Sequence, residues 1–192
     1  MTTIQHCKTN KCKEPIKREF LENIHICRHL AFPHGYTKTL RNGEIVARKP
    51  RDGFVNFAKG TVDAANEVLV ARDAVGNMTG ILTFNDHTTM TTLDGEPKPI
   101  AKKNEIYLDL VCGQKGTKAG TALINYFHAR AENDDVLKQT RLYAAEGSDK
   151  YWSRMGYVPC EDACKKQTRK NCYERRYKLD PNAGIRMTRC AK

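Results

Sequence analysis

The sequence predicts a single domain of the α+β class, with helices that flank a β-sheet. Three observations predict this class: an amphipathic helical pattern over residues 14–30, two apolar strands within residues 68–84, and a strand that turns into a helix within residues 106–133. Apolar residues repeat every two positions in a half-buried strand and about every 3.6 positions in a helix. At 192 residues, without a linker-like tract, the chain is long enough for one domain with a full core.

The N-terminal third is expected to contain two helices. Apolar residues at positions 16, 20, 24, 27 and 30 share one helical face, and Pro15 suits a first helical turn. A shorter helix is expected over residues 61–67. His25, His29 and His34 lie in this third, and we expect them to be surface or core side chains rather than bases.

Residues 68–84 are expected to form an antiparallel hairpin. The apolar runs 68–73 and 78–84 flank a Gly76-Asn77 turn, which favours a tight connection. The stretch that follows, residues 85–103, is long for a hairpin connection and is expected to be a lid or a loop.

Residues 106–124 form a pattern suited to binding phosphate. Apolar residues alternate along 106–111, as in a strand with two faces, and recur at helical spacing from residue 120 to about residue 133. The first turn of a helix leaves backbone N–H groups without partners at the positive end of the helix dipole. We therefore expect an anion to bind between the strand and the helix.

The connection between this strand and this helix carries the residues that such a site needs. Gly116 and Gly120 let the backbone approach a phosphate, and Lys115 and Lys118 add positive charge. A nucleoside-triphosphate loop would end in Gly-Lys-Ser/Thr, and a dinucleotide site would carry Gly-x-Gly-x-x-Gly. Neither pattern is present, because the glycines fall at positions 113, 116 and 120.

Two motifs indicate a family. Lys115-Gly-Thr-Lys-Ala-Gly-Thr-Ala-Leu123 resembles the Arg/Gln-Gly-x-Gly-x-Gly/Ala-x-x-Leu loop of the GNAT N-acetyltransferase superfamily, which holds the pyrophosphate of acetyl-coenzyme A. Residues 141–145 read as a strand, and residues 148–157 resemble the superfamily's short helix that ends in Phe-Tyr-x-x-x-Gly-Phe. The resemblance covers about residues 61–180. It implies a GNAT-like acyl-CoA N-acyltransferase fold, whose mostly antiparallel sheet splays between two strands, with last strands at residues 157–159 and 173–179.

The chain departs from this family pattern at several positions. Lys115 stands where the family usually has Gln or Arg, and Lys118 stands where it has glycine. A lysine forced into the left-handed conformation costs roughly 1–2 kcal/mol, so the loop is expected to adjust its path or Lys118 to meet a phosphate. Trp152 aligns with the tyrosine that protonates the departing thiolate, and Tyr151, one position earlier, is the alternative acid.

The resemblance implies acetyl-coenzyme A as co-substrate and a direct attack by a primary amine on the thioester. A backbone N–H around Leu110, Val111 or Cys112 is expected to stabilise the oxyanion. The residues expected to bind the coenzyme are Leu110, Val111, Cys112, Gln114, Lys115, Gly116, Thr117, Lys118, Ala119, Gly120, Thr121, Ser148 and Trp152.

Carboxylates on the central strand are candidates for the general base. Asp109 and Glu105 lie on this strand, and alternation places both on the face opposite Leu110. Asp109 is preferred because it lies nearer the strand end where the thioester is expected. The alternative is that Asp109 has a structural role and forms a salt bridge to a neighbouring strand. Glu146 is the reserve candidate. The expected catalytic residues are thus Asp109, Glu105 and Tyr151.

Eight cysteines without an export signal are expected to be reduced thiols. Two clusters, Cys7 with Cys12 and Cys160 with Cys164 and Cys172, lack the paired spacing of a zinc finger, so we expect no metal. Cys112 is expected to be a small core residue.

Charge is distributed unevenly along the chain. The net charge is +7 over residues 1–60, −4 over residues 61–137 and +8 over residues 138–192, which gives +11 overall. The basic ends could attract coenzyme A or nucleic acid, but aromatic residues do not interleave with the lysines as a base-stacking platform requires. No apolar run is long enough to cross a bilayer, so a soluble, cytoplasmic protein without a membrane partner is expected.

Two functions follow from these patterns. The first is an acetyl-CoA-dependent N-acetyltransferase that acts on a small amine or a lysine side chain. The second is a non-catalytic module of the same fold that binds acyl-coenzyme A or a polyanion, which Trp152 in place of tyrosine favours. The acceptor stays open, and so does the choice between a monomer and a homodimer.

Overall fold

The computed structural model contains two compact units. The first unit is Met1–Asn85 with Asp109–Phe127, and the second is Asp86–Leu108 with His128–Lys192. The single-domain organisation expected from the sequence stays a prediction. The structure describes residues 2–27, 37–39, 45–47, 52–86, 90–91, 97–98, 105–133, 139–144, 148–159 and 172–176.

The first unit is built on strands in the order β1-β4-β5-β8. These strands are β1 (Thr3–Cys7), β4 (Glu67–Arg72), β5 (Met78–Asp86) and the second half of β8 (Glu105–Gly113). β4 and β5 form the predicted antiparallel hairpin, and Gly76 in its turn has a φ of 93°, which glycine adopts without steric cost. β1, which the sequence analysis did not predict, pairs antiparallel with β4.

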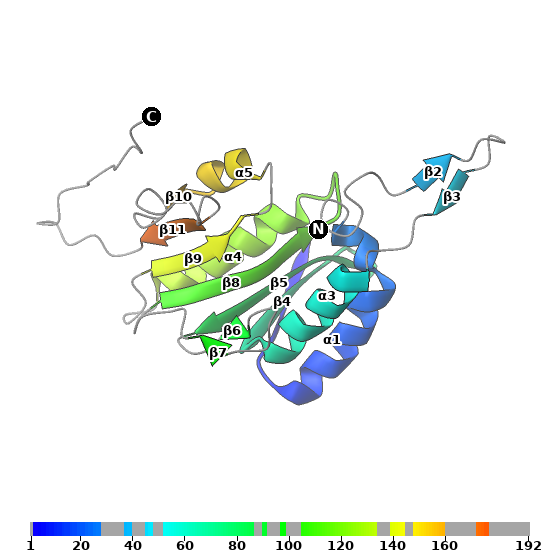
Figure 1. The fold of residues 1–192 in the computed structure, drawn as a ribbon, viewed down its shortest axis with the longest axis horizontal. Coiled ribbons are helices and arrows are strands. Elements are labelled where there is room, and N and C mark those ends of the chain that lie inside the picture. The colour runs from blue at the N-terminus through cyan, green and yellow to red at the C-terminus, as the bar shows by residue number, and fades with distance from the viewer. Residues whose placement is uncertain are drawn as a thin grey trace, which may run out of the picture. The chain divides into compact units, whose positions relative to one another are not determined.

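Helices α1 (Asn10–Glu22) and α3 (Asp52–Ala64) contact each other and cover one face of this part of the sheet (Figure 1). The helix predicted over residues 14–30 begins earlier, because the carbonyl of Thr9 accepts the N–H groups of Cys12 and Lys13, both at 3.1 Å. Pro15 therefore lies inside α1 rather than in its first turn.

Helix α1 also ends before the predicted boundary. The Asn23 side chain donates to the carbonyl of Glu19 at 2.9 Å, and a short 3₁₀ helix, η1 (Ile24–Cys27), follows. The predicted apolar positions Ile16, Phe20, Ile24 and Cys27 are all buried.

The segment between α1 and β4 also differs from the prediction. The short helix predicted over residues 61–67 is the end of α3, which starts at Asp52 and stops at Ala64. A separate antiparallel pair, β2 (Thr37–Thr39) and β3 (Ile45–Ala47), lies between α1 and α3 in the sequence. His29 and His34 lie outside the described residues, whereas His25 belongs to η1 and is half-buried.

Two disulfides contradict the expectation of reduced thiols for four of the cysteines. Cys7 is joined to Cys12, and Cys27 is joined to Cys112 across 85 residues of sequence. Cys27 and Cys112 are 3% and 4% exposed, so the core position expected for Cys112 is confirmed, although its sulfur is bonded. Sequence spacing could not reveal these pairs, because folding brings their Cα atoms together.

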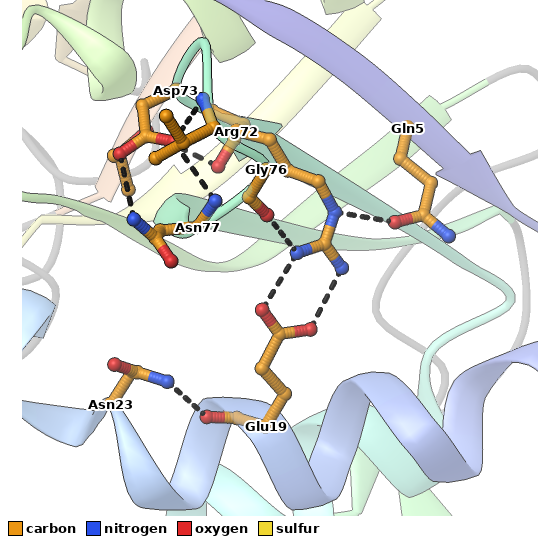
Figure 2. A network of polar contacts seen from close by, with 10 residues as sticks. Gln5, Glu19, Asn23, Arg72, Asp73, Gly76 and Asn77 are labelled. Atoms are coloured by element: carbon orange, nitrogen blue, oxygen red, sulfur yellow. Dashed lines mark hydrogen bonds and ion pairs between the residues drawn. The ribbon is translucent and has the colours of Figure 1, made fainter.

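Arg72 connects α1 to the β4–β5 hairpin through a set of charged hydrogen bonds, which Figure 2 shows. Its guanidinium donates to both carboxylate oxygens of Glu19, at 2.6 and 2.7 Å. It also donates to the side chain of Gln5 and to the carbonyl of Gly76, each at 2.9 Å. The Arg72 guanidinium lowers the pKa of Glu19, as expected for a two-bond arginine–carboxylate pair.

Helix α4 (Ala119–Glu132) lies close to β5 because Gly80 has no side chain. A Cβ at Gly80 would lie 2.9 Å from the carbonyl oxygen of Cys112 and 3.0 Å from the side chain of Leu123. The rings of Phe84 and Phe127 pack edge to face, with centroids 5.1 Å apart. The helix predicted over residues 120–133 is thus confirmed to within one residue at each end.

The second unit contains the first half of β8 and three more strands, in the order β8-β9-β11-β10. These are β9 (Gln139–Tyr143), β10 (Val158–Pro159) and β11 (Cys172–Arg176). β9 runs parallel to β8, from Glu105 opposite Gln139 to Leu108 opposite Leu142, whereas β11 is antiparallel to both β9 and β10. The predicted strands at residues 141–145 and 173–179 thus begin two residues and one residue earlier.

Shorter elements of the second unit are the helix α5 (Asp149–Arg154) and the antiparallel pair β6 (Met90–Thr91) and β7 (Pro97–Lys98). α5 is the short helix predicted within residues 148–157, and β6 and β7 lie in the stretch expected to be a lid or a loop. No helix in the described part of the chain has the length and apolarity needed to cross a membrane.

Replacing Thr83 by valine should stabilise the protein. Thr83 lies on β5 with no exposed surface, and its hydroxyl has no hydrogen-bond partner among the described residues. Removing a buried, unsatisfied hydroxyl should raise the free energy of unfolding by about 1 kcal/mol, measured by urea denaturation.

Thr79 on the same strand is the matched control. Its hydroxyl donates to the carbonyl of Ala71 at 3.2 Å, so Thr79→Val should lower the free energy of unfolding by about 1 kcal/mol. Equal losses of stability in the two variants would contradict this account of Thr83.

Candidate functional site

The predicted phosphate loop lies between the end of β8 at Gly113 and the start of α4 at Ala119. Its first half is fixed by hydrogen bonds. The N–H of Gln114 donates to the carbonyl of Thr79 at 2.8 Å, and the hydroxyl of Thr117 donates to the carbonyl of Gln114 at 2.7 Å. These bonds hold the loop to β5 and close it into a tight turn.

Several backbone N–H groups of the loop and the first helical turn have no partner among the described residues. The carbonyl of Lys118 accepts only the N–H of Ala122, at 3.0 Å, and the N–H of Ala119 reaches the Thr117 hydroxyl at 3.3 Å. The N–H groups that remain belong to Lys115, Gly116, Lys118, Gly120 and Thr121. Backbone donors at a helix N-terminus form an anion-binding site together with the helix dipole.

Lys118 adopts the left-handed conformation, with a φ of 58°. The expectation that the loop would adjust its path to avoid this conformation is therefore wrong. Because Thr117 is held by Gln114 and Gly116 already has a φ of 87°, the turn keeps the shape that suits glycine. The cost at Lys118 is about 1–2 kcal/mol, and such strain persists mainly where function or packing requires it. The side chains of Lys115 and Lys118 are exposed.

Gly113 brings the end of β8 against the start of α4. A Cβ at Gly113 would lie 2.5 Å from the backbone nitrogen of Gly120 and 3.0 Å from its Cα. Only glycine fits such a separation. Local sequence does not predict a role for Gly113, because the need for glycine arises from a contact with Gly120, seven residues away in the chain.

Asp109 lies on β8 four residues before this contact, and it is half-buried. The side-chain amide of Asn85 donates a hydrogen bond to Oδ2 of Asp109. Burial raises the pKa of Asp109 from 3.8 to about 7, while the hydrogen bond from Asn85 acts in the opposite direction. No ion pair to Asp109 is found among the described residues, so nothing there corresponds to the salt-bridge alternative.

Asn85 was missed as a site residue. Its side-chain oxygen accepts the backbone N–H of Asn66 at 2.8 Å, while its nitrogen contacts Asp109. The sequence analysis treated position 85 as the start of a loop, whereas β5 extends to Asp86. A long-range contact of this kind has no signal in local sequence.

The residues expected to supply the oxyanion donor lie on the second half of β8. The side chains of Leu110 and Cys112 are buried in the core beneath α1 and α3, and Val111 is half-buried. If these residues bind a coenzyme, they must therefore do so through their backbone groups. The side chains of Gln114, Thr117, Ala119 and Thr121 belong to the loop and to the first turn of α4.

The remaining predicted residues belong to the second unit. The carbonyl of Ser148 accepts the N–H groups of Tyr151 and Trp152, at 3.0 and 3.1 Å, and so begins α5. Trp152 is buried, and its ring packs edge to face on Tyr151 and on Tyr157, with centroids 5.1 and 5.3 Å away. Glu105 lies in β8, but the position of its side chain is not described, and Glu146 lies outside the described residues.

A buried polar pair supports this aromatic cluster. His128 Nε2 and the Tyr157 hydroxyl are 3.1 Å apart. Burial, with a smaller effect from Arg175, lowers the pKa of His128 to about 4, so its ring is neutral at physiological pH. The cluster therefore contributes packing without a charge.

Within the described residues, no group of histidine, cysteine and carboxylate side chains is arranged to hold a metal ion. Cys7 and Cys12, one of the two clusters considered, are joined as a disulfide. Cys160 and Cys164 of the other cluster lie outside the described part of the chain.

Comparison of structures identifies the fold. An acetyltransferase of the GNAT family from Staphylococcus aureus Mu50 matches with a TM-score of 0.55 and 13% identity, over 92% of this chain and all of that one. A GNAT family N-acetyltransferase from Escherichia coli, in complex with CoA, matches with a TM-score of 0.56 and 11% identity, over 92% of this chain and 82% of that one. A GNAT family acetyltransferase from Brucella melitensis, in complex with acetyl-CoA, matches with a TM-score of 0.50 and 16% identity, over 94% and 90%.

These similarities confirm the predicted fold class. The chain has the GNAT acetyltransferase fold, a mixed sheet flanked by helices. No sequence family model matches the chain, and no curated protein resembles it in sequence. At these low identities the agreement concerns the fold, so the activity must be argued from the site.

Replacing Gly113 by alanine should disturb the start of α4. The added methyl group would overlap the Gly120 backbone, and relieving such an overlap typically costs about 1–3 kcal/mol in unfolding free energy. Urea denaturation of Gly113→Ala measures this cost. Gly60→Ala is the control, because Gly60 lies inside α3 with nothing within 4 Å, and it should be neutral or stabilising. Equal stability of Gly113→Ala and the wild-type protein would contradict the close contact.

The pKa of Asp109 also predicts a pH dependence of stability. Between pH 3.8 and about 7 the folded protein holds a proton on Asp109 that the unfolded chain has released. The contribution of Asp109 to the free energy of unfolding should therefore fall as pH rises through this window. Asp109→Asn should be more stable than the wild type at pH 8 and gain much less at pH 4, as measured by denaturant unfolding. A gain that is equal at both pH values would contradict the raised pKa.

Proposed function

We propose that this protein is an N-acetyltransferase that transfers the acetyl group of acetyl-coenzyme A directly to a primary amine. The observation that carries the proposal is the loop after β8. There, a left-handed Lys118 and the N–H groups of Gly116, Lys118, Gly120 and Thr121, which have no partner in the described part of the chain, lie at the start of α4. Two similar structures of the same fold hold CoA and acetyl-CoA, which supports this choice of co-substrate.

The loop suits a diphosphate for two physical reasons. A diphosphate presents several oxygens that each accept a hydrogen bond, and the loop offers several backbone donors next to a helix N-terminus. The exposed ammonium groups of Lys115 and Lys118 add favourable charge for the same anion. Gln114, Thr117 and Ala119 shape the turn that presents these donors.

In the proposed reaction, Asp109 is the general base. The acceptor arrives as an ammonium ion, and one of its protons passes to the Asp109 carboxylate. The neutral amine attacks the thioester carbon, and backbone N–H groups of Leu110, Val111 or Cys112 stabilise the oxyanion. The carbon–sulfur bond then breaks and its electron pair leaves with the sulfur, while the nitrogen gives up its second proton to solvent, which leaves the neutral amide and the thiolate of coenzyme A. A carboxyl group whose pKa is about 7 suits this task, because at neutral pH a good fraction is ionised and still basic.

The residue that protonates the thiolate cannot follow the family pattern, since Trp152 stands where the family has a tyrosine. We propose Tyr151, one position earlier on α5, as the acid, and packing of Trp152 against Tyr151 supports the position of its ring. A thiol with a pKa of about 8.5 also leaves as the thiolate near neutral pH, so this proton is not essential. Ser148 and Trp152 are proposed to contact the coenzyme, and Glu105 is a reserve base.

The acceptor is proposed to be a small amine or a lysine side chain. Asp109, half-buried and without a salt bridge in the described part of the chain, can pair with one ammonium group at a time. The alternative function is a non-catalytic module that binds acyl-coenzyme A, and the observation that favours it is Trp152 in place of the tyrosine acid. We propose that nucleic acid is not the main partner.

Mixing the protein with acetyl-coenzyme A and a panel of amines, and following release of free thiol, tests the proposal. We expect thiol release with at least one primary amine, and a rate lower by about 10²–10⁴-fold in Asp109→Asn, because the general base is lost. Lys59→Ala, which changes an exposed lysine of α3, is the control and should keep the wild-type rate.

The same samples separate the two candidate functions. A melting temperature raised by acetyl-coenzyme A, without thiol release for any amine, would favour the binding module. No rise in melting temperature and no thiol release would count against both functions.

A further inference from the structure

We infer that Asn85 is a positioning residue for this reaction: its side-chain amide holds Oδ2 of Asp109, and this leaves Oδ1 as the oxygen that receives the acceptor's proton. The inference rests on the proposed function, because it concerns the base of that reaction. Asn85 is not expected to touch the substrate. It acts through the orientation and the charge state of Asp109.

The first support is the way in which Asn85 itself is oriented. Its side-chain oxygen accepts the backbone N–H of Asn66 at 2.8 Å, in the short connection between α3 and β4. A carboxamide has one accepting end and one donating end. Because the accepting end is used by Asn66, the donating end must face Asp109, as the hydrogen bond to Oδ2 shows.

The second support is that this bridge ties together three separate elements. Asn66 precedes β4, Asn85 is near the end of β5, and Asp109 is on β8. A side chain held at both ends has little rotational freedom left, so it presents its N–H group to Asp109 in one geometry. A base must be held within hydrogen-bonding reach of the proton that it takes, which makes such positioning valuable.

The chemistry of the amide decides which oxygen takes the proton. An N–H donor bonds much better to an ionised carboxylate oxygen than to a protonated one. With Oδ2 engaged by Asn85, the proton released from the ammonium forms its new O–H bond at Oδ1. The N–H bond of the ammonium breaks, its electron pair stays on nitrogen, and Asp109 becomes neutral.

In the described part of the first unit, no other charged group contacts Asp109. Asp109 has no partner but Asn85 among the described residues; burial raises the pKa of Asp109, and the hydrogen bond from Asn85 lowers it. Several charged side chains on β4, α3 and α1 are engaged in ion pairs with residues other than Asp109. They form the pairs Glu67 with His6 and Lys8, Asp63 with Lys17, and Arg72 with Glu19.

Two substitutions separate the donor from the acceptor of the Asn85 side chain. Asn85→Asp keeps an acceptor for Asn66 but replaces the donor with a like charge. Asn85→Ala removes both ends. Asn77→Ala is the matched control, because the Asn77 side chain also donates to an aspartate, Asp73 Oδ2, at 3.1 Å in the exposed β4–β5 turn.

The main readout is the titration of aspartate carboxyl carbons by ¹³C NMR, with Asp109→Asn used to assign the Asp109 signal. We expect the Asp109 midpoint to rise by about one pH unit in Asn85→Ala, because a hydrogen bond to a charged group is lost. In Asn85→Asp, the two facing carboxyl groups should titrate in two separated steps. Asn77→Ala should leave the Asp109 midpoint unchanged.

A second readout is the pH profile of acetyl transfer to an amine. The base works when it is ionised, so its rate limb should move to higher pH in Asn85→Ala by the same amount as the NMR midpoint. At pH values above that limb, the rate of Asn85→Ala should approach the wild-type rate. A purely structural role for Asn85 would lower the rate at every pH without moving the limb.

Unchanged Asp109 midpoints in Asn85→Ala and Asn85→Asp would overturn the inference, as would an equal shift in Asn77→Ala. The NMR midpoints do not depend on turnover. If the wild-type protein transfers no acetyl group while the midpoints shift as expected, the proposed reaction is overturned and the hold of Asn85 on Asp109 is supported.

Discussion

The close approach of β8 to α4 is the contact on which the candidate site depends. Gly113 lies against the Gly120 backbone with no room for a methyl group, so the helix starts directly beside the end of the strand. The connection must reverse direction within Gln114–Lys118, and it does so with two residues at positive φ. This close approach confines the turn in which Lys118 is strained, and it places the N–H groups that any first helical turn leaves without intrahelical partners beside the end of β8.

Sequence periodicity identified the elements whose two faces differ. β8, α4 and the β4–β5 hairpin were predicted with boundaries close to those observed, because their apolar residues repeat at the period of their own structure. β1 was missed because its residues are mostly polar, and its pairing with β4 comes from a partner about sixty residues away. The start of α1 was misplaced because Pro15 was taken as a first-turn residue. The disulfides were missed because they join cysteines that only folding brings together.

The residues of the candidate site also divide into those that the sequence predicts and those that it does not. Asp109 and the loop were predicted because their residue types and spacing lie within one continuous stretch. Asn85 and Gly113 were not, since one acts through a contact between strands and the other through the absence of a side chain. Lys118 illustrates a third reason. The loop was expected to adjust its path around Lys118 or to let Lys118 meet a phosphate, and the first alternative is wrong because the contacts around the turn outweigh a preference of about 1–2 kcal/mol.

The Cys27–Cys112 bond reaches from the layer of helices to the residue just before Gly113. Closing a chain segment of this length restricts the unfolded ensemble by an amount equivalent to roughly 4–5 kcal/mol. The oxidation state of Cys27 and Cys112 therefore matters in any preparation of the protein. Reduction of this bond would change the covalent structure at the strand that precedes the connection Gln114–Lys118.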